Sequence, residues 1–308
     1  MRHPAPASIS PEARKMLAES PAIVARSMDL DSLNKRRKDT YDHYAPQGEK
    51  LVRELGGSAA DVTLGGVRTQ MVTAKEGAGD GKAILYLFGG GFVQGSPQED
   101  LCITAMLAKT TGRAVYVPYY RLSPENPCPA PLEDVLATYR ALVAEKGAGA
   151  VTLMGESAGG GLALSLMLRL AKDGLPLPSR VVLLSPWCDI SETGDTLTTL
   201  EGCDPTLHYK ATLEGPAKAY AGSRDLKDPL VSPLYADFPK NFPKTLITTG
   251  TRDLFLSDCA RLSTKMRAAG IDAELRVWEG MWHVFEYYLE LPEARASLSE
   301  IATFIQEA

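Results

Sequence analysis

The chain has 308 residues, a formal net charge of −5 and a pI of about 5.5, with 44% hydrophobic and 23% charged residues. This length fits one α/β domain with an appendage or two small domains, and the composition is that of a globular protein with a sizeable core. The acidic balance argues against a nucleic-acid-binding protein, which needs a basic face. The basic run NKRRK at 34–38 is interpreted as a solvated helix face.

Cysteine usage and hydropathy indicate the compartment. The five cysteines are odd in number and show no metal-ligand spacing, which is typical of free thiols in a reducing compartment. The segment MRHPAPASISPEARK has no apolar core of a secretory signal, and no stretch approaches the ~20 apolar residues of a membrane span. We therefore expect a cytoplasmic protein without a membrane span and without a bound metal.

The predicted elements begin with helices and continue as alternating strands and helices. Residues 1–50 read as two short helices, broken around Pro21 and ending near Pro46. DVTLGGVRTQMVTA then predicts two strands joined at Gly65–Gly66. Buried strands are predicted at 82–89, 113–119, 150–155, 180–186, 244–250 and 272–280. Helical patterns occupy about 97–110, 130–146, 158–173, 257–269 and 292–307.

This alternation predicts βαβ units and a mostly parallel, eight-stranded sheet with helices on both faces. Residues 187–243 interrupt the rhythm with a helical middle and no clear strand. We expect the helices of 1–50 and this insertion to form a cap over the carboxyl ends of the strands, where such folds bind ligands. The catalytic domain is then 51–308.

The strongest local signal is LMGESAGGG at 153–161, a G-x-S-x-G match around Ser157. The serine follows a buried-strand pattern and opens a helix pattern, as a nucleophile elbow requires. Small flanking residues allow the sharp turn that projects the hydroxyl. The alternative is a tight turn with a helix-capping serine.

A serine nucleophile needs a base, and the base needs an orienting carboxylate. Of the four histidines, only His283 directly follows a predicted strand, and His3, His43 and His208 are interpreted as surface residues. Asp253 ends the preceding strand, whereas its competitor Asp258 falls within a helix pattern. The order Ser157, Asp253, His283 is that of α/β-hydrolases.

The stretch YLFGGGFVQGS places three glycines just after a strand. A tetrahedral intermediate of acyl transfer carries negative charge, and bare backbone N–H groups can approach that oxyanion closely. We expect Gly90 and Gly91 to donate, together with Ala158, the residue after the proposed nucleophile. A phosphate-binding loop is the alternative, but its Lys-Ser/Thr and G-x-G-x-x-G patterns are missing.

Taken together, residues 60–308 resemble the hormone-sensitive-lipase-like α/β-hydrolases, the bacterial family IV esterases. The motifs that carry the resemblance are FGGGF, YYRLSPENPCPAPLEDV, GESAGGG, SPWCD, DPLVSPLY, GTRDLFLSD and HVF. Within that branch, GMWHVF resembles a subgroup that includes monoterpene lactone hydrolases and antibiotic N-acetyl hydrolases. The resemblance implies an α/β-hydrolase fold with a helical cap, no cofactor, and short- to medium-chain acyl substrates. Dimers are common in the branch, which makes a homodimer an open expectation.

The chain departs from the family motif at two positions. Phe88 stands where the family has the histidine that holds the glycine turn, and Tyr119 stands where it usually has aspartate. Phenylalanine has no donor or acceptor, so aromatic packing would have to replace a polar tether. We also expect four aromatic side chains to contact the substrate: Phe88, Phe92, Trp187 and Trp282.

The sequence thus predicts a serine carboxylesterase acting on a small ester. A lactone hydrolase or an N-acetyl hydrolase with the same triad is the first alternative. The second is a non-catalytic small-molecule binder, since the family includes a plant gibberellin receptor that has lost the triad histidine. The presence of His283 favours the enzyme.

Overall fold

The computed structural model of the chain describes residues 3–75 and 80–307 and contains an eight-stranded sheet of order β1-β2-β4-β3-β5-β6-β7-β8. The predicted strands are confirmed, with small shifts at their ends. They are β1 (Ser58–Leu64), β2 (Val67–Thr73), β3 (Ala83–Leu87), β4 (Ala114–Pro118), β5 (Val151–Glu156), β6 (Arg180–Leu184), β7 (Thr245–Gly250) and β8 (Ala273–Trp278).

Most of the sheet is parallel, as the βαβ pattern predicts. β2 pairs antiparallel with β1 and β4, and every other neighbouring pair is parallel. The turn between β1 and β2 uses Gly65 and Gly66 at φ values of +59° and +82°, which suits glycine. A Cβ on Gly65 would also lie 2.3 Å from the carbonyl oxygen of Ala137, so this turn packs tightly against a helix.

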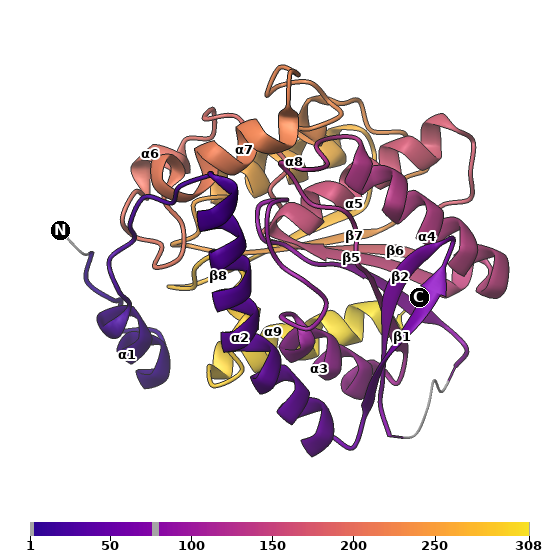
Figure 1. The fold of residues 1–308 in the computed structure, drawn as a ribbon, viewed down its shortest axis with the longest axis horizontal. Helices are drawn as coiled ribbons and strands as arrows, with labels where there is room; N and C mark the ends of the chain where they lie inside the picture. Colours follow the sequence, from indigo (N-terminus) through magenta and orange to yellow (C-terminus); the bar gives the residue numbers. More distant parts are fainter. Residues whose placement is uncertain (1–2, 76–79, 308) are drawn as a thin grey trace.

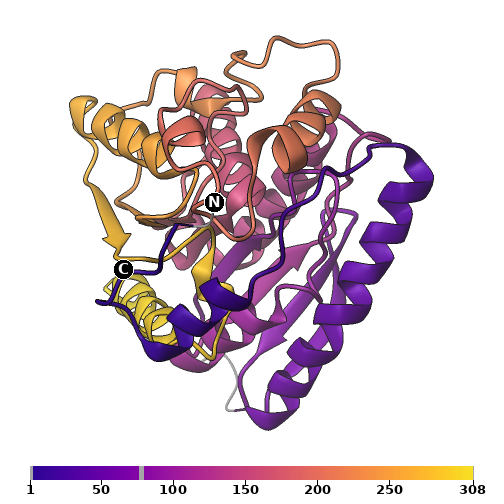
Figure 2. The same cartoon turned by 90° about the vertical axis from the view of Figure 1, so that its left-hand side faces the viewer.

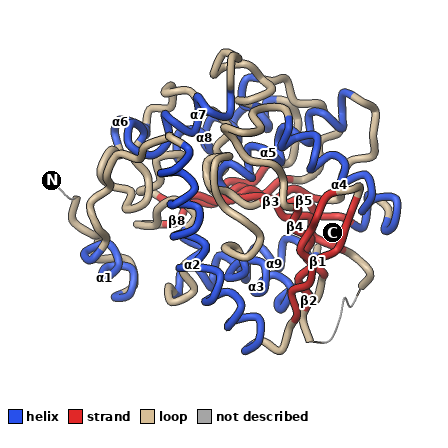
Figure 3. Tube along the Cα trace, viewed as in Figure 1, coloured by secondary structure: helices blue, strands red, loops and turns tan. Residues whose placement is uncertain are grey.

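Helices cover both faces of the sheet (Figures 1 and 3). One face carries α3 and α9, which contact each other, and the other carries α4, α5 and α8. The bounds are α3 (Leu101–Thr111), α4 (Ala130–Lys146), α5 (Ser157–Lys172), α8 (Leu256–Ala268) and α9 (Pro292–Gln306). The expected helices are therefore confirmed, although α3 begins a turn later than its pattern predicted.

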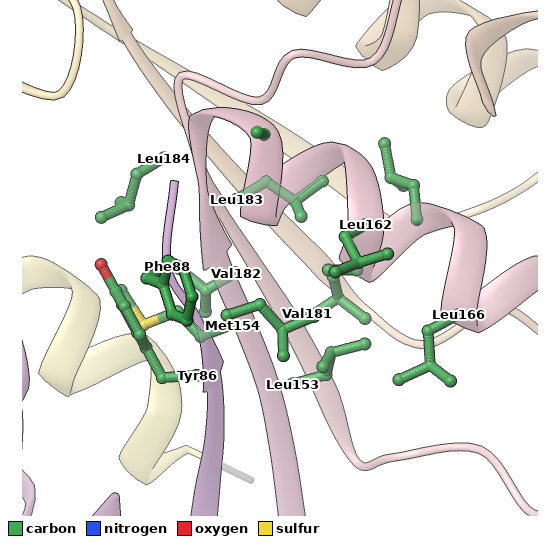
Figure 4. Packing of buried hydrophobic residues seen from close by; sticks show 14 of the residues in the cluster. Tyr86, Phe88, Leu153, Met154, Leu162, Leu166, Val181, Val182, Leu183 and Leu184 are labelled. Atoms are coloured by element: carbon green, nitrogen blue, oxygen red, sulfur yellow. The ribbon is translucent and has the colours of Figure 1, made fainter. Parts of the chain in front are cut away.

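The core lies between the central strands and the helices. Figure 4 shows side chains of β5 and β6, among them Leu153 and Val181, beside Leu162 and Leu166 of α5. These four side chains are all 0% exposed. The two leucines are four residues apart and so share one face of the helix. This packing fixes the start of α5 relative to the end of β5.

The N-terminal segment forms α1 (Pro11–Glu19) and α2 (Leu30–Glu54). The predicted end near Pro46 is wrong, because α2 continues through this proline and past the predicted domain division at residue 50. Its buried face extends beyond the proline to Gly48 and Val52, and a Cβ on Gly48 would lie 2.4 Å from the Leu101 Cβ. Tertiary packing against α3 thus outweighs the hydrogen bond that proline removes.

The basic run of α2 is only partly a solvated face. Its two lysines are exposed and pair with acids four residues further on. Arg36 and Arg37 instead turn inward: Arg36 Nε donates to Gln94 Oε1 at 2.9 Å, and Arg37 Nε donates to the Val93 carbonyl at 2.7 Å. The interpretation of all five residues as solvated is therefore corrected. The arginines fasten α2 to the loop that follows β3.

The insertion at 187–243 contains α6 (Thr196–Thr199) and α7 (Glu214–Ala221) and no strand. Figure 2 shows the N-terminal segment crossing one side of the molecule, with the insertion above it. The backbone N–H of Arg26 donates to the carbonyl of Ala211 at 3.0 Å, which joins the two segments directly. Among the helices of the described ranges, none is both long and apolar enough to cross a membrane.

Candidate active site

Ser157 lies in a strained turn between β5 and α5. Its φ is +52°, a conformation that few non-glycine residues adopt. A Cβ on Gly155 would lie 2.4 Å from the Gly159 carbonyl oxygen, and one on Gly159 would lie 2.0 Å from that of Leu87. Both positions therefore require glycine. The predicted strand–turn–helix context is present and holds the Ser157 hydroxyl at the carboxyl end of the sheet.

Three side chains form a hydrogen-bonded chain at this edge. His283 Nε2 lies 2.9 Å from Ser157 Oγ, and His283 Nδ1 lies 3.3 Å from Asp253 Oδ1. Ser157 and His283 are 7% and 8% exposed, whereas Asp253 is fully buried. Asp258 lies within α8 and accepts a hydrogen bond from Arg261 instead. The structure thus brings together the three residues that the sequence placed after three different strands.

The surroundings of Asp253 suit an ionised carboxylate. Oδ1 accepts from the backbone N–H of Phe255 at 2.9 Å, and Oδ2 accepts from Thr249 Oγ1 at 2.8 Å. Burial on its own would raise the pKa of Asp253, but the charge and hydrogen bond of His283, with further hydrogen bonds, bring it below its usual value. The carboxylate can therefore accept a hydrogen bond from Nδ1–H and fix the tautomer of the imidazole.

The glycine loop 89–91 lies beside Ser157 in a conformation open to few residues. Gly90 and Gly91 have φ values of +96° and +65°, and a Cβ on Gly90 would lie 2.2 Å from the Gln94 carbonyl oxygen. The carbonyl of Gly90 accepts from the N–H groups of Val93 and Gln94, which closes the turn. Ala158 is the second residue of α5, where helix N–H groups have no intrahelical acceptor.

Phe88 is held by Tyr120, the residue after Tyr119. Its ring stacks on Tyr120 with centroids 4.2 Å apart, and the Tyr120 hydroxyl donates to the Phe88 carbonyl at 2.6 Å. Tyr119 instead lies under the Arg68 guanidinium at 4.2 Å. The aromatic packing on Phe88 therefore comes from Tyr120, and not from Tyr119.

A second group supports the loop from the nucleophile side. The Glu156 carboxyl lies against Gly89, where a Cβ would be only 2.1 Å from Glu156 Oε1. Glu156 is 7% exposed. Burial, together with repulsion from Asp100, raises the pKa of Glu156 well above its ordinary value, whereas a hydrogen bond from the Gly89 backbone opposes this rise. The residue before the nucleophile thus braces the first glycine of the loop.

A cavity of about 1260 Å³ opens above these groups. Ser157, His283, Gly90 and Gly91 line it, and so do residues of α1, α2 and the insertion. Trp282 is also among the residues around the cavity, although it is 0% exposed, and its contact with a substrate stays a prediction. Phe88, Phe92 and Trp187 do not line the cavity: their side chains are at most 2% exposed and pack in the core. We therefore no longer expect these three side chains to contact the substrate directly, because their rings point into the core.

Buried acids lie on one side of the cavity. Glu99 and Asp100 line it and are each 7% exposed. Burial raises the pKa of Glu99 to about 7, although a hydrogen bond from Ser96 opposes this rise, and burial with repulsion from Glu99 raises the pKa of Asp100.

All five cysteines are free thiols. In residues 3–75 and 80–307, no three His, Cys, Asp or Glu side chains gather as metal ligands.

Sequence reasoning missed the residues that support the site. Tyr120 and Glu156 sit inside recognised motifs, but neither spacing nor composition shows that they brace the glycine loop. Asp204 lies in the insertion, 79 positions before the histidine whose backbone it contacts. Its one signal was the Asp-Pro-Thr pattern, which predicts a turn and no distant contact.

Comparisons with known proteins agree with this geometry. Residues 84–287 match a family described as the alpha/beta hydrolase fold. An acetyl-hydrolase of Streptomyces hygroscopicus is 34% identical over 276 residues, covering 88% of this chain and 89% of its own. An esterase of Acinetobacter venetianus is 30% identical over 245 residues, covering 79% and 80%.

Comparison with solved structures assigns the chain to the same family. The crystal structure of an esterase, E25, superposes with a TM-score of 0.92 at 30% identity, covering 100% of this chain and 97% of that one. An esterase from the bacterial hormone-sensitive lipase family has a TM-score of 0.80 at 34% identity, with coverage of 92% and 99%. The chain therefore belongs to the α/β-hydrolases and, within them, to the hormone-sensitive-lipase family of bacterial esterases.

Proposed function

We propose that the protein is a serine carboxylesterase that hydrolyses short- to medium-chain carboxylic esters through an acyl-enzyme. The observation that carries the proposal is the chain Asp253–His283–Ser157, with its 2.9 Å contact between His283 Nε2 and Ser157 Oγ at the floor of a cavity. Such a nucleophile–base–carboxylate arrangement is the recurring geometry of acyl transfer.

In the first half of the reaction, Ser157 Oγ attacks the ester carbonyl while His283 Nε2 takes its proton. Asp253 keeps Nδ1 protonated and stabilises the imidazolium that forms. The N–H groups of Gly90, Gly91 and Ala158 hold the oxyanion, each contributing on the order of 3 kcal/mol to the lowering of the barrier. His283 then passes its proton to the departing alkoxide.

In the second half, water takes the place of the alcohol. His283 removes a proton from this water, and the resulting hydroxide attacks the acyl group on Ser157. Collapse of the second tetrahedral intermediate returns the proton to Ser157 and releases the acid. Neither half requires a cofactor, because the proton is moved by His283 and the oxyanion is held by the backbone.

The space beside the glycine loop favours a short acyl group. Pro216 of α7 lines the cavity and lies so close to Gly91 that a Cβ there would be 3.2 Å from Pro216 Cβ. The remainder of the cavity extends under α1 and α2 and has room for a larger alcohol group. A lactone or N-acetyl substrate is the second candidate, and one relative named an acetyl-hydrolase favours acetyl transfer to water.

A panel of p-nitrophenyl esters from C2 to C12, with a lactone and an N-acetyl anilide alongside, tests the substrate class. We expect kcat/KM to be highest between C2 and C6 and at least tenfold lower at C12. A maximum at C12 would contradict the short acyl site. Cleavage of the anilide or lactone without cleavage of any ester would support the second candidate instead.

A further inference from the structure

A second carboxylate reaches the proposed base from the insertion. Asp204 is 2% exposed, and its Oδ2 accepts the backbone N–H of His283 at 3.1 Å. Its Oδ1 accepts from Thr206 N and Oγ1, both at 2.7 Å, and from Leu207 N at 3.1 Å. One oxygen therefore closes a turn within the insertion, while the other holds the loop that carries His283.

These contacts complete the fixation of a strained loop. Val284, the next residue, has a φ of +46°, and its N–H donates to Ser185 Oγ at 3.2 Å. The His283 ring is held at Nδ1 by Asp253 and at Nε2 by Ser157. Its backbone, however, is held by Asp204. The direction of the imidazole thus depends on a residue of the insertion, which lies outside the strands and helices that carry the triad.

The charges around His283 are mostly negative. Asp253 and Asp204 face it, and Glu286 is buried three residues further along, bonded to Thr248 and Ser297. The guanidinium of Arg252, the residue before Asp253, donates to the carbonyls of Cys203, His3 and Pro4. At the end of β5, Glu156 turns to the glycine loop. Among the neighbouring titratable groups, Cys203 and Tyr288 lie near Asp204, and His208 pairs with Glu201 at 2.5 Å.

Hydrogen bonding also suits an ionised Asp204. Burial and repulsion from Asp253 leave the pKa of Asp204 above its ordinary value, although the attraction of His283 and the two hydrogen bonds from Thr206 oppose that rise. When His283 gains a proton, the opposite charge favours the carboxylate further. The attraction between Asp204 and His283 is therefore strongest at the moment when the imidazolium forms.

We propose that Asp204 is a positioning residue of the reaction. It orients His283 through the backbone N–H and adds a second negative charge beside the imidazolium. The ability of His283 to act as the base therefore depends on how the insertion packs against the loop that carries it. The inference rests on the proposed role of His283 as general base. It concerns a different residue, segment and contact from the Asp253 pair.

The test is Asp204→Asn, measured by the rate at which a fluorophosphonate probe labels Ser157 between pH 5 and 9. Asparagine has one acceptor oxygen where aspartate has two, so its NH₂ group must face either His283 N–H or the N–H groups of the turn. We expect labelling at the optimum to fall ten- to a hundredfold. Loss of the negative charge disfavours the imidazolium, so the acid limb should move to lower pH by about 0.5 to 1 unit.

The matched control is Asp189→Asn. Asp189 is fully buried in the same insertion and bonds Ser191, Tyr235 and Arg261, away from the triad. We expect this variant to lower Tm and to leave the acid limb unchanged. Asp225→Asn, in an exposed turn of the same segment, gives a second control that keeps the fold.

The outcomes separate this inference from the proposed function. An Asp204→Asn acid limb equal to that of the wild type, in a folded variant, overturns the inference and leaves the triad intact. An equal shift in Asp189→Asn also overturns it, because loosening of the insertion would then suffice. If wild-type Ser157 is not labelled at all, the proposed function itself fails.

Discussion

At the scale of single residues, the glycine loop and the residue before it should respond differently to substitution. Gly90 has a φ of +96° and no room for a Cβ beside the Gln94 carbonyl, so Gly90→Val must move the loop. We expect kcat to fall on the order of a hundredfold or more, the scale of losing one oxyanion donor. Ester hydrolysis with circular dichroism on the folded variant measures this.

Phe88→His is the companion change. Phe88 does not line the cavity and stacks on Tyr120. We expect kcat/KM to change by less than about tenfold, roughly 1.4 kcal/mol. Stability should fall by about 1–3 kcal/mol, since the buried imidazole lacks an assured partner. Loss of turnover in Phe88→His, with Gly90→Val tolerated, would contradict the assignment of the loop.

The residues of the proposed triad were predictable because their types are rare or their backbones unusual. Ser157 sits where two glycines permit a positive φ, and His283 was the one histidine directly after a predicted strand. The supporting contacts were not predictable, since they depend on how distant segments pack. The stack of Phe88 on Tyr120, and not on Tyr119, depends on which way consecutive residues point at a strand end.

At the scale of elements, Arg37 fastens α2 to the loops around the site. Its guanidinium donates to the carbonyls of Val93 and Ser123 and to both oxygens of Glu125, and the side chain is 21% exposed. We expect Arg37→Met to lower the free energy of unfolding by about 1–3 kcal/mol and to reduce hydrogen-exchange protection at 88–95.

Arg53 offers the control on the same helix. Its side chain is 70% exposed and lies 3.9 Å from Glu49. We expect Arg53→Met to change stability by no more than about 0.5 kcal/mol. Equal Tm shifts for the two variants would mean that α2 is not held through Arg37. The sequence alone could not separate these arginines, because both belong to a strongly charged helix.

At the scale of the whole molecule, buried acids make stability depend on pH. Burial raises the pKa of Glu99 from its ordinary 4.5 to about 7. Between these two pH values, Glu99 keeps a proton in the folded protein that it has released in the unfolded chain. The contribution of Glu99 to the stability of the folded protein is therefore complete below pH 4.5 and is lost as the pH rises to about 7. The loss amounts to about 3 kcal/mol for this group.

Glu99→Gln removes this titration and keeps an acceptor for Ser96. Compared with the wild type, the variant should have a Tm several degrees higher at pH 8 and nearly the same Tm at pH 5. Thermal unfolding at the two pH values measures the difference. A variant that is less stable than the wild type at pH 8 would show that a cation compensates Glu99.

The architecture was predictable at this scale because each strand reads as a short apolar run and each crossover as a helix. The eight strands and five flanking helices follow directly from that rhythm. The ends of α2 and the path of the insertion do not follow from that rhythm, since they are set by packing. Pro46 is a helix breaker in sequence, yet α2 continues past it along the surface of α3.

The central claim is that Ser157 is the nucleophile of a triad with His283 and Asp253, and the site of fluorophosphonate labelling tests it most directly. Peptide mass spectrometry of the wild type should find one adduct, on Ser157. His283→Ala should be labelled orders of magnitude more slowly, because the serine loses its base. Ser157→Ala should be folded, unlabelled and inactive on p-nitrophenyl acetate. An adduct on another serine with Ser157 unmodified, or full activity in Ser157→Ala, would contradict the account.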